Sequence, residues 1–236
     1  MAAEKIYMED AYIKEFSARV LSVSGGNHII LDRTAFYPLG GGQPNDVGVL
    51  KREGEEFRVV NVLKSGEEIV HEVDRGGLKE GDEVLGIIEW NRRYNHMKSH
   101  TAAHVISTVI NRETGALITG NQLYENKFRV DFDLENFDKE LFLKLIDLAN
   151  EELGRAREVK TYYLPREEAL KIPGMVKLAG VLPPEVDKLR IVEIEDLDIQ
   201  ADGGTHVRNT SEIGKLKFDS AENKGRGRKR VMVVLE

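Results

Sequence analysis

The 236-residue sequence contains no cysteine. This absence excludes a disulfide framework and any zinc finger built on cysteine ligands. Long apolar runs are also missing. No stretch could span a bilayer, and the first residues lack the charged-then-apolar pattern of a secretion signal. Together these absences predict a cytoplasmic protein without a membrane segment.

The sequence also has no excess of positively charged residues. The formal net charge is -7 at pH 7, and the chain is 41% hydrophobic and 32% charged, an ordinary globular composition. A negative net charge argues against a dedicated nucleic-acid coat protein, although an acidic protein can still carry local basic patches. The length allows one large domain or two modest ones.

Residues 1–88 are rich in short apolar runs separated by glycine. FSARVLSV and HIILD are joined by SGGN, which is typical of a hairpin turn, and FRVVNVLK, EIVHEV and EVLGIIEW follow. Short strands with glycine turns predict a small N-terminal β-barrel domain. A glycine-rich loop, RTAFYPLGGGQPNDVG, lies among these strands.

The pattern becomes helical after Trp90. Residues 91–112 contain neither proline nor glycine, and their apolar residues recur at helical spacing, with Gly115 marking the end. A second amphipathic helix is predicted in ENFDKELFLKLIDLANEELG, with Asn136 or Asp138 as its N-cap.

Strands then alternate with these helices without strict order. KFRVDFD, EVKTYYL, LRIVEIEDL, EIGKLKFDS and KRVMVVLE are the predicted strands, and Pro165 opens a short helix over REEALK. Residues 89–236 are therefore predicted to form a two-layer α/β domain with a mainly antiparallel sheet. The whole chain is predicted to be an α+β protein of two domains.

Three of the six histidines stand at steps of four in the first predicted helix: His96, His100 and His104. Histidines four residues apart lie on one helical face, one turn apart, and can hold a single metal ion as in zinc peptidases. Thr101 stands where those peptidases carry their general-base glutamate, so a zinc peptidase is excluded. An isolated pair of helical histidines is more often a partly buried polar face.

A second segment, DIQADGGTHVRNTSEIG at residues 198–214, favours a metal site over a partly buried polar face. His206 follows two glycines, and Asp202 stands four residues before it. Gly203 and Gly204 would let the backbone bend so that both side chains turn toward one point. Three imidazoles and a carboxylate form a competent tetrahedral zinc set, here drawn from two distant segments.

HTAAH, followed about a hundred residues later by DGGTH, resembles the editing domain of alanyl-tRNA synthetases and of their free-standing AlaX-type relatives. Threonyl-tRNA synthetases carry a related editing domain. The loop TAFYPLGGGQPNDVG resembles the glycine-rich motif of the domain that precedes this editing core. The resemblance spans nearly the whole chain. It leaves no room for an aminoacylation domain, and no ATP-binding motif is present, so it points to the free-standing editor in its longer form with an N-terminal barrel.

The family signature pairs HxxxH with CxxxH, and Asp202 occupies the cysteine position here. The resemblance implies one Zn²⁺ per chain, held by His100, His104 and His206 with Asp202 as the fourth ligand. A carboxylate is a harder ligand than a thiolate, which predicts weaker zinc binding than in the family pattern. Two alternatives stay open for Asp202: it acts through a metal-bound water, or it has no role in metal binding. His96 lies off the ligand line, because the helix drifts ~40° over two turns, and is read as structural or as facing tRNA.

The resemblance implies hydrolysis of the ester between tRNA for alanine and a wrongly attached serine or glycine, with alanine spared. Thr34, at the edge of the glycine-rich loop, is the candidate for hydrogen-bonding the serine hydroxyl. Its ordinary alternative is a threonine in a β-turn. Gly40, Gly41 and Gly42 would let the loop approach a substrate, and Gln43 either contacts the substrate or braces the loop.

Further contacts are predicted at two other places. Asn121 and Gln122 fall in a region that lines the pocket in the family, against the alternative of a solvated turn. Arg92 and Arg93, with the basic segment NKGRGRKR at residues 223–230, are candidates for tRNA phosphate, against the alternative of solvated surface.

The sequence thus predicts a zinc-dependent hydrolase that acts in trans on mischarged tRNA for alanine. The alternative is a non-catalytic tRNA-binding module with a structural zinc. A third interpretation is a metal-free structural protein whose histidines only pack.

Overall fold

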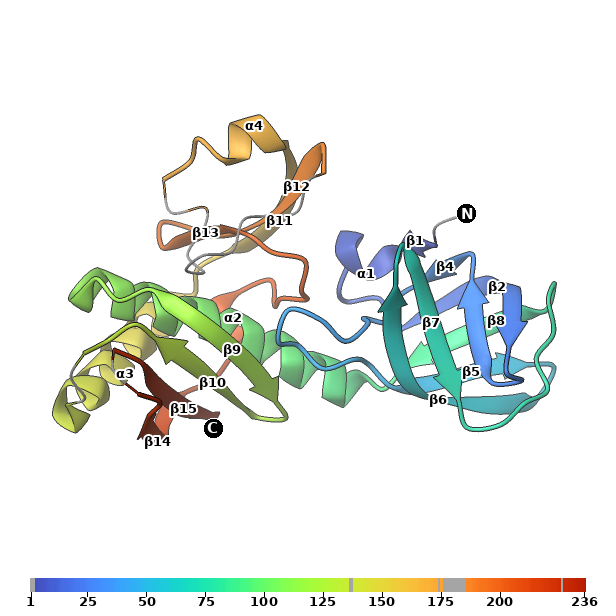
Figure 1. The fold of residues 1–236 in the computed structure, drawn as a ribbon, viewed down its shortest axis with the longest axis horizontal. Coiled ribbons are helices and arrows are strands. Elements are labelled where there is room, and N and C mark those ends of the chain that lie inside the picture. Colours follow the sequence, from blue (N-terminus) through green and yellow to red (C-terminus); the bar gives the residue numbers. More distant parts are fainter. Residues whose placement is uncertain (1–2, 136–137, 174, 176–185, 226) are drawn as a thin grey trace. The chain divides into compact units, whose positions relative to one another are not determined.

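The computed structural model describes residues 3–135, 138–173, 175, 186–225 and 227–236. It confirms the α+β class, with a closed antiparallel barrel followed by a region of sheets and helices (Figure 1). The chain divides into two compact units, Met1–Asn95 and His96–Glu236. The domain limits 1–88 and 89–236 stay a prediction. None of the described helices has the length and apolar character needed to span a lipid bilayer.

Six of the described strands close the barrel in the first unit, in the order β2-β3-β7-β6-β5-β8. They are β2 (Glu15–Ser24), β3 (His28–Leu31), β5 (Gly48–Arg52), β6 (Glu55–Ser65), β7 (Glu68–Val73) and β8 (Glu83–Ile88). Alternate residues of β2 and β7 point into a core that includes Phe16, Phe36 and Phe57. The interior is filled by side chains, as expected for a barrel of this size.

Three small elements complete the first unit. The two-residue strands β1 (Glu4–Lys5) and β4 (Arg33–Thr34) pair in parallel, and α1 (Ile6–Glu9) follows β1. The sequence did not predict these elements or β5. Strand β5 forms because it pairs with β6 on one side and β8 on the other. Gly48 allows the close pairing with β8, since a Cβ there would lie 2.1 Å from the carbonyl oxygen of Ile87.

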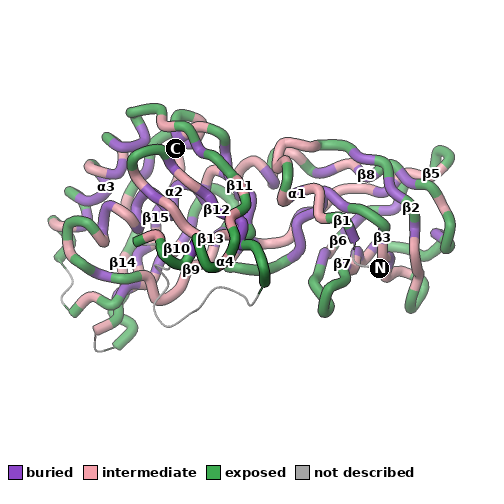
Figure 2. The backbone as a smooth tube through the Cα atoms, turned by 90° about the horizontal axis from the view of Figure 1, so that it is seen from above, coloured by how far each residue is buried: buried purple, intermediate pink, exposed green. Residues whose placement is uncertain are grey.

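The second unit contains a four-stranded antiparallel sheet in the order β14-β15-β10-β9. Its strands are β9 (Ile118–Tyr124), β10 (Lys127–Phe132), β14 (Leu216–Asn223) and β15 (Lys229–Leu235). Helices α2 (Trp90–Thr114) and α3 (Lys139–Gly154) lie on one side of this sheet (Figures 1 and 2). Helix α2 ends as predicted at Gly115, whose φ of 75° suits glycine.

A second sheet of three described strands follows the order β11-β12-β13. Its strands are β11 (Val159–Pro165), β12 (Lys188–Ile194) and β13 (Asp198–Ala201), with the short helix α4 (Arg166–Ala169) after β11. A small core of Ala169, Met175, Leu189 and Ile191 packs against it. Figure 2 shows buried segments in purple in both units, so each unit has a core of its own.

Three local expectations can be compared with the structure: the solvated-turn alternative for residues 121–122 and the strand start at residue 212 are wrong, and the cap at Asp138 is confirmed. Asn121 and Gln122 lie in strand β9, paired with β10, and not in a turn. The strand predicted from residue 212 begins at Leu216, because Asn209 and Glu212 form a capping box around the 3₁₀ turn Thr210–Glu212. Asp138 caps α3 by accepting from the backbone of Glu140, whereas Asn136 lies outside the described residues.

Candidate metal centre

Two segments of the second unit bring four polar side chains together. His100 and His104 come from successive turns of α2, and Asp202 and His206 come from the loop after β13. Each offers one ligand atom, and these atoms all lie within 4.8 Å of one another. From the carboxylate oxygens of Asp202, the Nε2 atoms of His206, His100 and His104 lie at 3.1, 3.5 and 3.8 Å.

This donor set fits zinc. Zinc bonds of about 2.0–2.2 Å in a tetrahedron place neighbouring ligand atoms roughly 3.4 Å apart. From Oδ2 of Asp202, the Nε2 atoms of His100 and His104 lie slightly farther away, at 3.5 and 3.8 Å, and Nε2 of His206 lies 3.1 Å from the other carboxylate oxygen, Oδ1. Nitrogen donors with one carboxylate are ligands that zinc accepts. The three imidazoles are largely buried, with exposed fractions of 2–7%. The side chain of Asp202 is 23% exposed, so the arrangement can hold a divalent cation at a largely buried position that is open on the carboxylate side.

Backbone hydrogen bonds hold Asp202 in place. Its Oδ1 accepts from the amide of Gly204 at 2.6 Å, while Oδ2 is the carboxylate oxygen nearest to His100 and His104. The largely buried Arg190 of β12 donates to the carbonyl oxygens of Asp202 and Gly204, at 3.0 Å each. These bonds fix the turn between β13 and His206.

The two glycines of this turn have a different role from the one predicted. Neither Gly203 nor Gly204 is among the described residues with positive φ, so extra backbone bending is not what glycine provides here. Gly204 instead provides space. A Cβ at this position would lie 2.2 Å from Cε1 of His100, so the imidazole ring packs directly on the bare backbone.

The charges of the cluster are strongly coupled. Burial raises the pKa of the Asp202 carboxyl, but the charge of His100 and hydrogen bonds with the histidines outweigh it and hold that pKa well below its usual range. Burial and the charge of His100 hold the pKa of His206 well below its usual range. Burial would lower the pKa of His104, yet hydrogen bonds to Asp198 and Asp202 raise it to about 9. Without a metal, His104 therefore carries a proton that a cation must displace.

Two histidines of the cluster are hydrogen-bonded at Nδ1 to residues that the sequence did not identify as candidates. Nδ1 of His104 lies 2.9 Å from Oδ2 of Asp198, whose side chain is fully buried. Nδ1 of His206 lies 3.1 Å from Oγ1 of Thr101. Asp198 begins the segment that contains Asp202, and Thr101 follows His100 directly, but no local pattern marks either residue as a partner. His96 is buried and does not belong to the four-residue group.

Thr34 lies in the first unit, in strand β4, and is fully buried. It stands at the start of the glycine-rich loop, with its side chain inside the unit. Nδ1 of His71 lies 3.1 Å from the carbonyl oxygen of Ile29, which can only accept, so this nitrogen carries the proton. Burial lowers the pKa of His71 to about 4 and keeps the ring neutral. Nε2 then accepts from the hydroxyl of Thr34 at 2.8 Å, and Thr34 Oγ1 accepts from the amide of Phe36.

The rest of the glycine-rich loop is held by a short backbone bridge between Gly40 and Gln43. Gly41 and Gly42, between them, have φ values of 59° and 83°, which glycine adopts readily. Gly40 and Gly41 are exposed, whereas Gln43 is fully buried. The loop therefore presents its glycines to solvent and keeps Gln43 inside.

Arg93 and Arg92 differ sharply in accessibility. Arg93 is fully buried, forms an ion pair with the buried Asp46, and donates to the carbonyl oxygens of Ala11 and Ala35. These contacts brace the start of α2 against the loop before β5, and they leave Arg93 no exposed surface for phosphate. Arg92 is part-exposed and donates to the carbonyl oxygen of Asn45.

The other predicted contacts lie in the second unit. Asn121 and Gln122 are part-buried on β9. The described residues of the basic segment lie at the end of β14, at the start of β15 and between these strands, where the amide of Lys224 donates to the carbonyl oxygen of Arg228. Arg230 pairs with Asp131 on the neighbouring strand β10, so part of the positive charge of this segment is used within the sheet.

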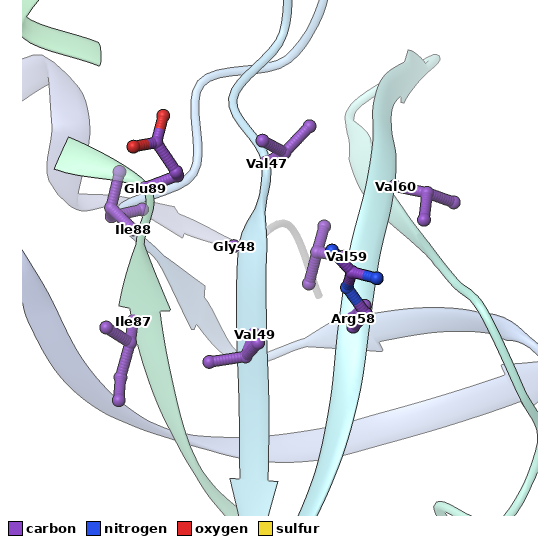
Figure 3. Close-up of a pocket in the computed structure, with 9 residues that line it drawn as sticks. All are labelled: Val47, Gly48, Val49, Arg58, Val59, Val60, Ile87, Ile88 and Glu89. Carbon is purple, nitrogen blue, oxygen red and sulfur yellow. The ribbon is translucent and has the colours of Figure 1, made fainter. Parts of the chain in front are cut away.

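A pocket of about 480 Å³ lies elsewhere, within the first unit. Figure 3 shows its lining on three strands, with β5 in the middle and β6 and β8 on either side. The lining is mostly valine and isoleucine, with Arg58 and Glu89 as its charged members. None of the predicted site residues belongs to it.

Comparison with known proteins adds an independent line of support. The family model of tRNA synthetases class II (A) matches residues 3–92, and that of the threonyl and alanyl tRNA synthetase second additional domain matches residues 189–232. The alanyl-tRNA editing protein AlaX-M of Saccharolobus solfataricus is 50% identical, and the match covers 99% of each chain. AlaX-M of Methanosarcina mazei is 46% identical over 98% of this chain and 96% of its own.

A longer relative matches as well. The alanine–tRNA ligase of Pyrococcus abyssi is 43% identical over 96% of this chain, but the match covers 25% of the ligase. The editing proteins, in contrast, match from end to end. At half of all positions identical over essentially the full length, the chain belongs to the AlaX-M family of alanyl-tRNA editing proteins.

Proposed function

We propose that the chain hydrolyses the ester between tRNA for alanine and a wrongly attached serine, accepts glycine as a second substrate, and leaves alanine attached. The coarser part follows from its family: the relatives are alanyl-tRNA editing proteins, so the chain is a hydrolase that edits tRNA for alanine. The observation that carries the finer part is the convergence of His100 and His104 with Asp202 and His206. A protein acting on charged tRNA works in the cytoplasm, where we place it.

The metal of this centre is zinc in our proposal. Three imidazole nitrogens and Oδ2 of Asp202 would hold it, and Gly204 and Arg190 keep the carboxylate and its turn in position. Zinc bound there would polarise the ester carbonyl or anchor the aminoacyl end. The chain supplies the buried surroundings that exclude competing water and strengthen electrostatic contacts.

Selectivity is assigned to Thr34, which is fully buried, so a serine hydroxyl reaches it only if the residues that cover it move. Its proton is donated to His71, and one lone pair of Oγ1 accepts from Phe36, so the remaining lone pair can only accept a further hydrogen bond. A serine hydroxyl can donate to this oxygen, whereas the methyl group of alanine cannot. This hydrogen bond separates serine from alanine and does not account for the release of glycine, which has no side chain. A site built to pair with a hydroxyl disfavours the analogue that lacks one.

The remaining contacts with tRNA are assigned by accessibility. Gly40, Gly41 and Gly42 would let a substrate approach the loop, with Gln43 as the internal support of that loop. Gln122 and Asn121, on β9, are proposed to orient the substrate. Arg92 and the β14–β15 hairpin would contact phosphates, since both retain positive charge near solvent.

The decisive experiment compares three substrates on the same tRNA for alanine, charged with serine, glycine or alanine. We expect the zinc-loaded protein to release serine and glycine and to leave alanine in place. His104→Gln should abolish release. His28→Gln is the matched control, because His28 lies on barrel strand β3, outside the cluster.

A non-catalytic module predicts a different result. In that case serine would leave at the uncatalysed rate even though one zinc ion per chain is bound. Such a result would remove the hydrolase proposal and leave the metal site intact.

A further inference from the structure

The contacts behind the metal centre determine which nitrogen each histidine can offer. A neutral imidazole carries one proton, on Nδ1 or on Nε2, and the nitrogen without it is the one that binds a metal. In this centre the Nε2 atoms of His104 and His206 face Asp202, while their Nδ1 atoms face away toward Asp198 and Thr101. Nε2 of His206 also lies 3.1 Å from Oδ1 of Asp202, a carboxylate oxygen that can accept a proton from this ring, so the two tautomers of His206 compete and the partner of Nδ1 decides between them. Metal binding requires the proton on Nδ1 in both rings.

Thr101 can satisfy this requirement for His206 because its own proton is already used. Its hydroxyl donates to the carbonyl oxygen of Met97 at 3.1 Å, one turn earlier in α2. The oxygen must then act as acceptor toward Nδ1 of His206, and it also accepts from the amide of Val207 at 3.3 Å. Every one of these residues is buried, so water offers no competing partner.

Asp198 has the same effect on His104 through a different group. A carboxylate is an acceptor, so Nδ1 of His104 donates to Oδ2 at 2.9 Å. The side-chain amide of Gln200 donates to the same oxygen at 2.8 Å and steadies it. The carboxylate comes from β13, four residues before Asp202, so one short segment supplies both a ligand and the support of another ligand.

We propose that Thr101 and Asp198 are positioning residues of the metal centre, which fix His206 and His104 in the tautomers that present Nε2 to the cation. The proposal rests on the metal site of the proposed function. It gives Thr101 a role of its own at the position where zinc peptidases carry a catalytic glutamate. Partners of this kind typically contribute 10–100-fold to metal affinity, which is about the effect we expect here.

The test is a zinc-affinity titration of the full-length protein against a chromophoric chelator. Thr101→Val keeps the shape but removes the acceptor, and we expect zinc affinity to fall by about 10–100-fold. Thr101→Ser should restore it, because serine can donate to Met97 and accept from His206 in the same way. Asp198→Ala should show a loss of similar size, and Asp198→Asn a smaller one, since its amide oxygen can still accept.

Helix α2 offers a matched control in Thr114. Its hydroxyl also donates to a carbonyl one turn earlier, that of Ile110, and also accepts an amide proton, from Ala116, but it contacts no histidine of the cluster. Thr114→Val should lower thermal stability about as much as Thr101→Val and leave zinc affinity unchanged. Equal zinc affinity of Thr101→Val and Thr114→Val would overturn the proposal for Thr101.

A second readout does not depend on metal or activity. Long-range ¹H–¹⁵N spectra of the imidazoles distinguish the two tautomers, and we expect Nδ1–H for His206 in the wild type and a mixture in Thr101→Val. An Nε2–H tautomer for His206 in the wild type would contradict the proposal. If the zinc affinities follow the prediction while Ser-tRNA stays charged, the hydrolase fails and the positioning role stands. A wild type that binds no zinc would remove both.

Discussion

Each unit of the molecule buries a hydrogen-bonded threonine–histidine pair. The threonine donates the hydrogen bond in one pair, and the histidine donates it in the other. In the barrel, the hydroxyl of Thr34 donates to Nε2 of His71. In the second unit, Nδ1 of His206 donates to the hydroxyl oxygen of Thr101. The side chains, their burial and the hydrogen-bond lengths are alike, at 2.8 and 3.1 Å.

The difference arises from which member of each pair donates its proton to a backbone carbonyl. The carbonyl of Ile29 takes the histidine proton in the barrel, so the imidazole is left as acceptor. The carbonyl of Met97 takes the threonine proton in α2, so the imidazole is left as donor on that side and its other nitrogen faces the cluster. The same two residue types thus produce a hydroxyl that can only accept in one unit and a metal-binding nitrogen in the other.

The largest effect should come from removing one histidine of each pair. His206→Gln deletes a ligand atom, and we expect zinc affinity to fall by more than the roughly 100-fold that a supporting residue contributes. His71→Gln should leave zinc affinity unchanged, since His71 lies in the barrel. Isothermal titration with zinc measures both. Equal losses in the two variants would mean that the pairs are not functionally distinct.

The barrel pair predicts a dependence of stability on pH. The pKa of His71 is about 4 in the folded chain and 6.5 in the unfolded one, so between these values the unfolded state binds the extra proton. Stability should therefore fall as pH drops from 6.5 to 4, by up to roughly 3 kcal/mol. Urea unfolding from pH 4 to pH 8 measures this slope. The non-titrating His71→Gln should reduce this slope and leave the part that His206 contributes through its own lowered pKa. An equal slope in both proteins would assign the effect to other groups.

A smaller effect is expected from the threonine of the barrel pair. Thr34→Val removes the acceptor that we assign to the serine hydroxyl, and we expect the preference for serine over alanine to fall roughly ten-fold, the equivalent of one hydrogen bond. Thr34→Ser should retain the preference. Zinc content must stay constant in both variants. An unchanged ratio of serine to alanine release would remove Thr34 from the proposed site.

The smallest change concerns the ligand that departs from the family pattern. Asp202→Cys replaces a carboxylate by a softer thiolate, which we expect to bind zinc as tightly as the wild type or more tightly. Competition with a chelator at fixed pH measures the difference. Weaker binding would indicate that the hydrogen bond from Gly204 to the carboxylate matters more than the softness of the ligand.

The sequence predicted the parts of the centre that follow from periodicity and spacing. His100 and His104 could be placed on one face because they are four residues apart in a regular helix. Thr101 and Asp198 could not be predicted as partners of His206 and His104, because those contacts join residues 105 and 94 positions apart. Gly204 was selected for backbone freedom, yet its role is spatial and depends on a ring from another segment.

The same limit applies to the fold. The barrel and the helices were predictable from alternation and helical spacing. Arg93 was assigned to phosphate because it stands next to Arg92 in a basic stretch, and only the packing reveals its buried pair with Asp46. Strand β9 contains Gly120 and Asn121, which disfavour strands by propensity, and it forms because β10 pairs with it along most of its length, with one register shift near its start.

The close approach of His100 to Gly204 has a consequence for how the centre can vary. Even alanine at residue 204 would place a methyl group inside the van der Waals radius of the imidazole. Substitution there would displace a ligand ring without altering any ligand. In a saturation-mutagenesis screen, this position should therefore be as intolerant as the histidines, although it contributes no atom to the cation.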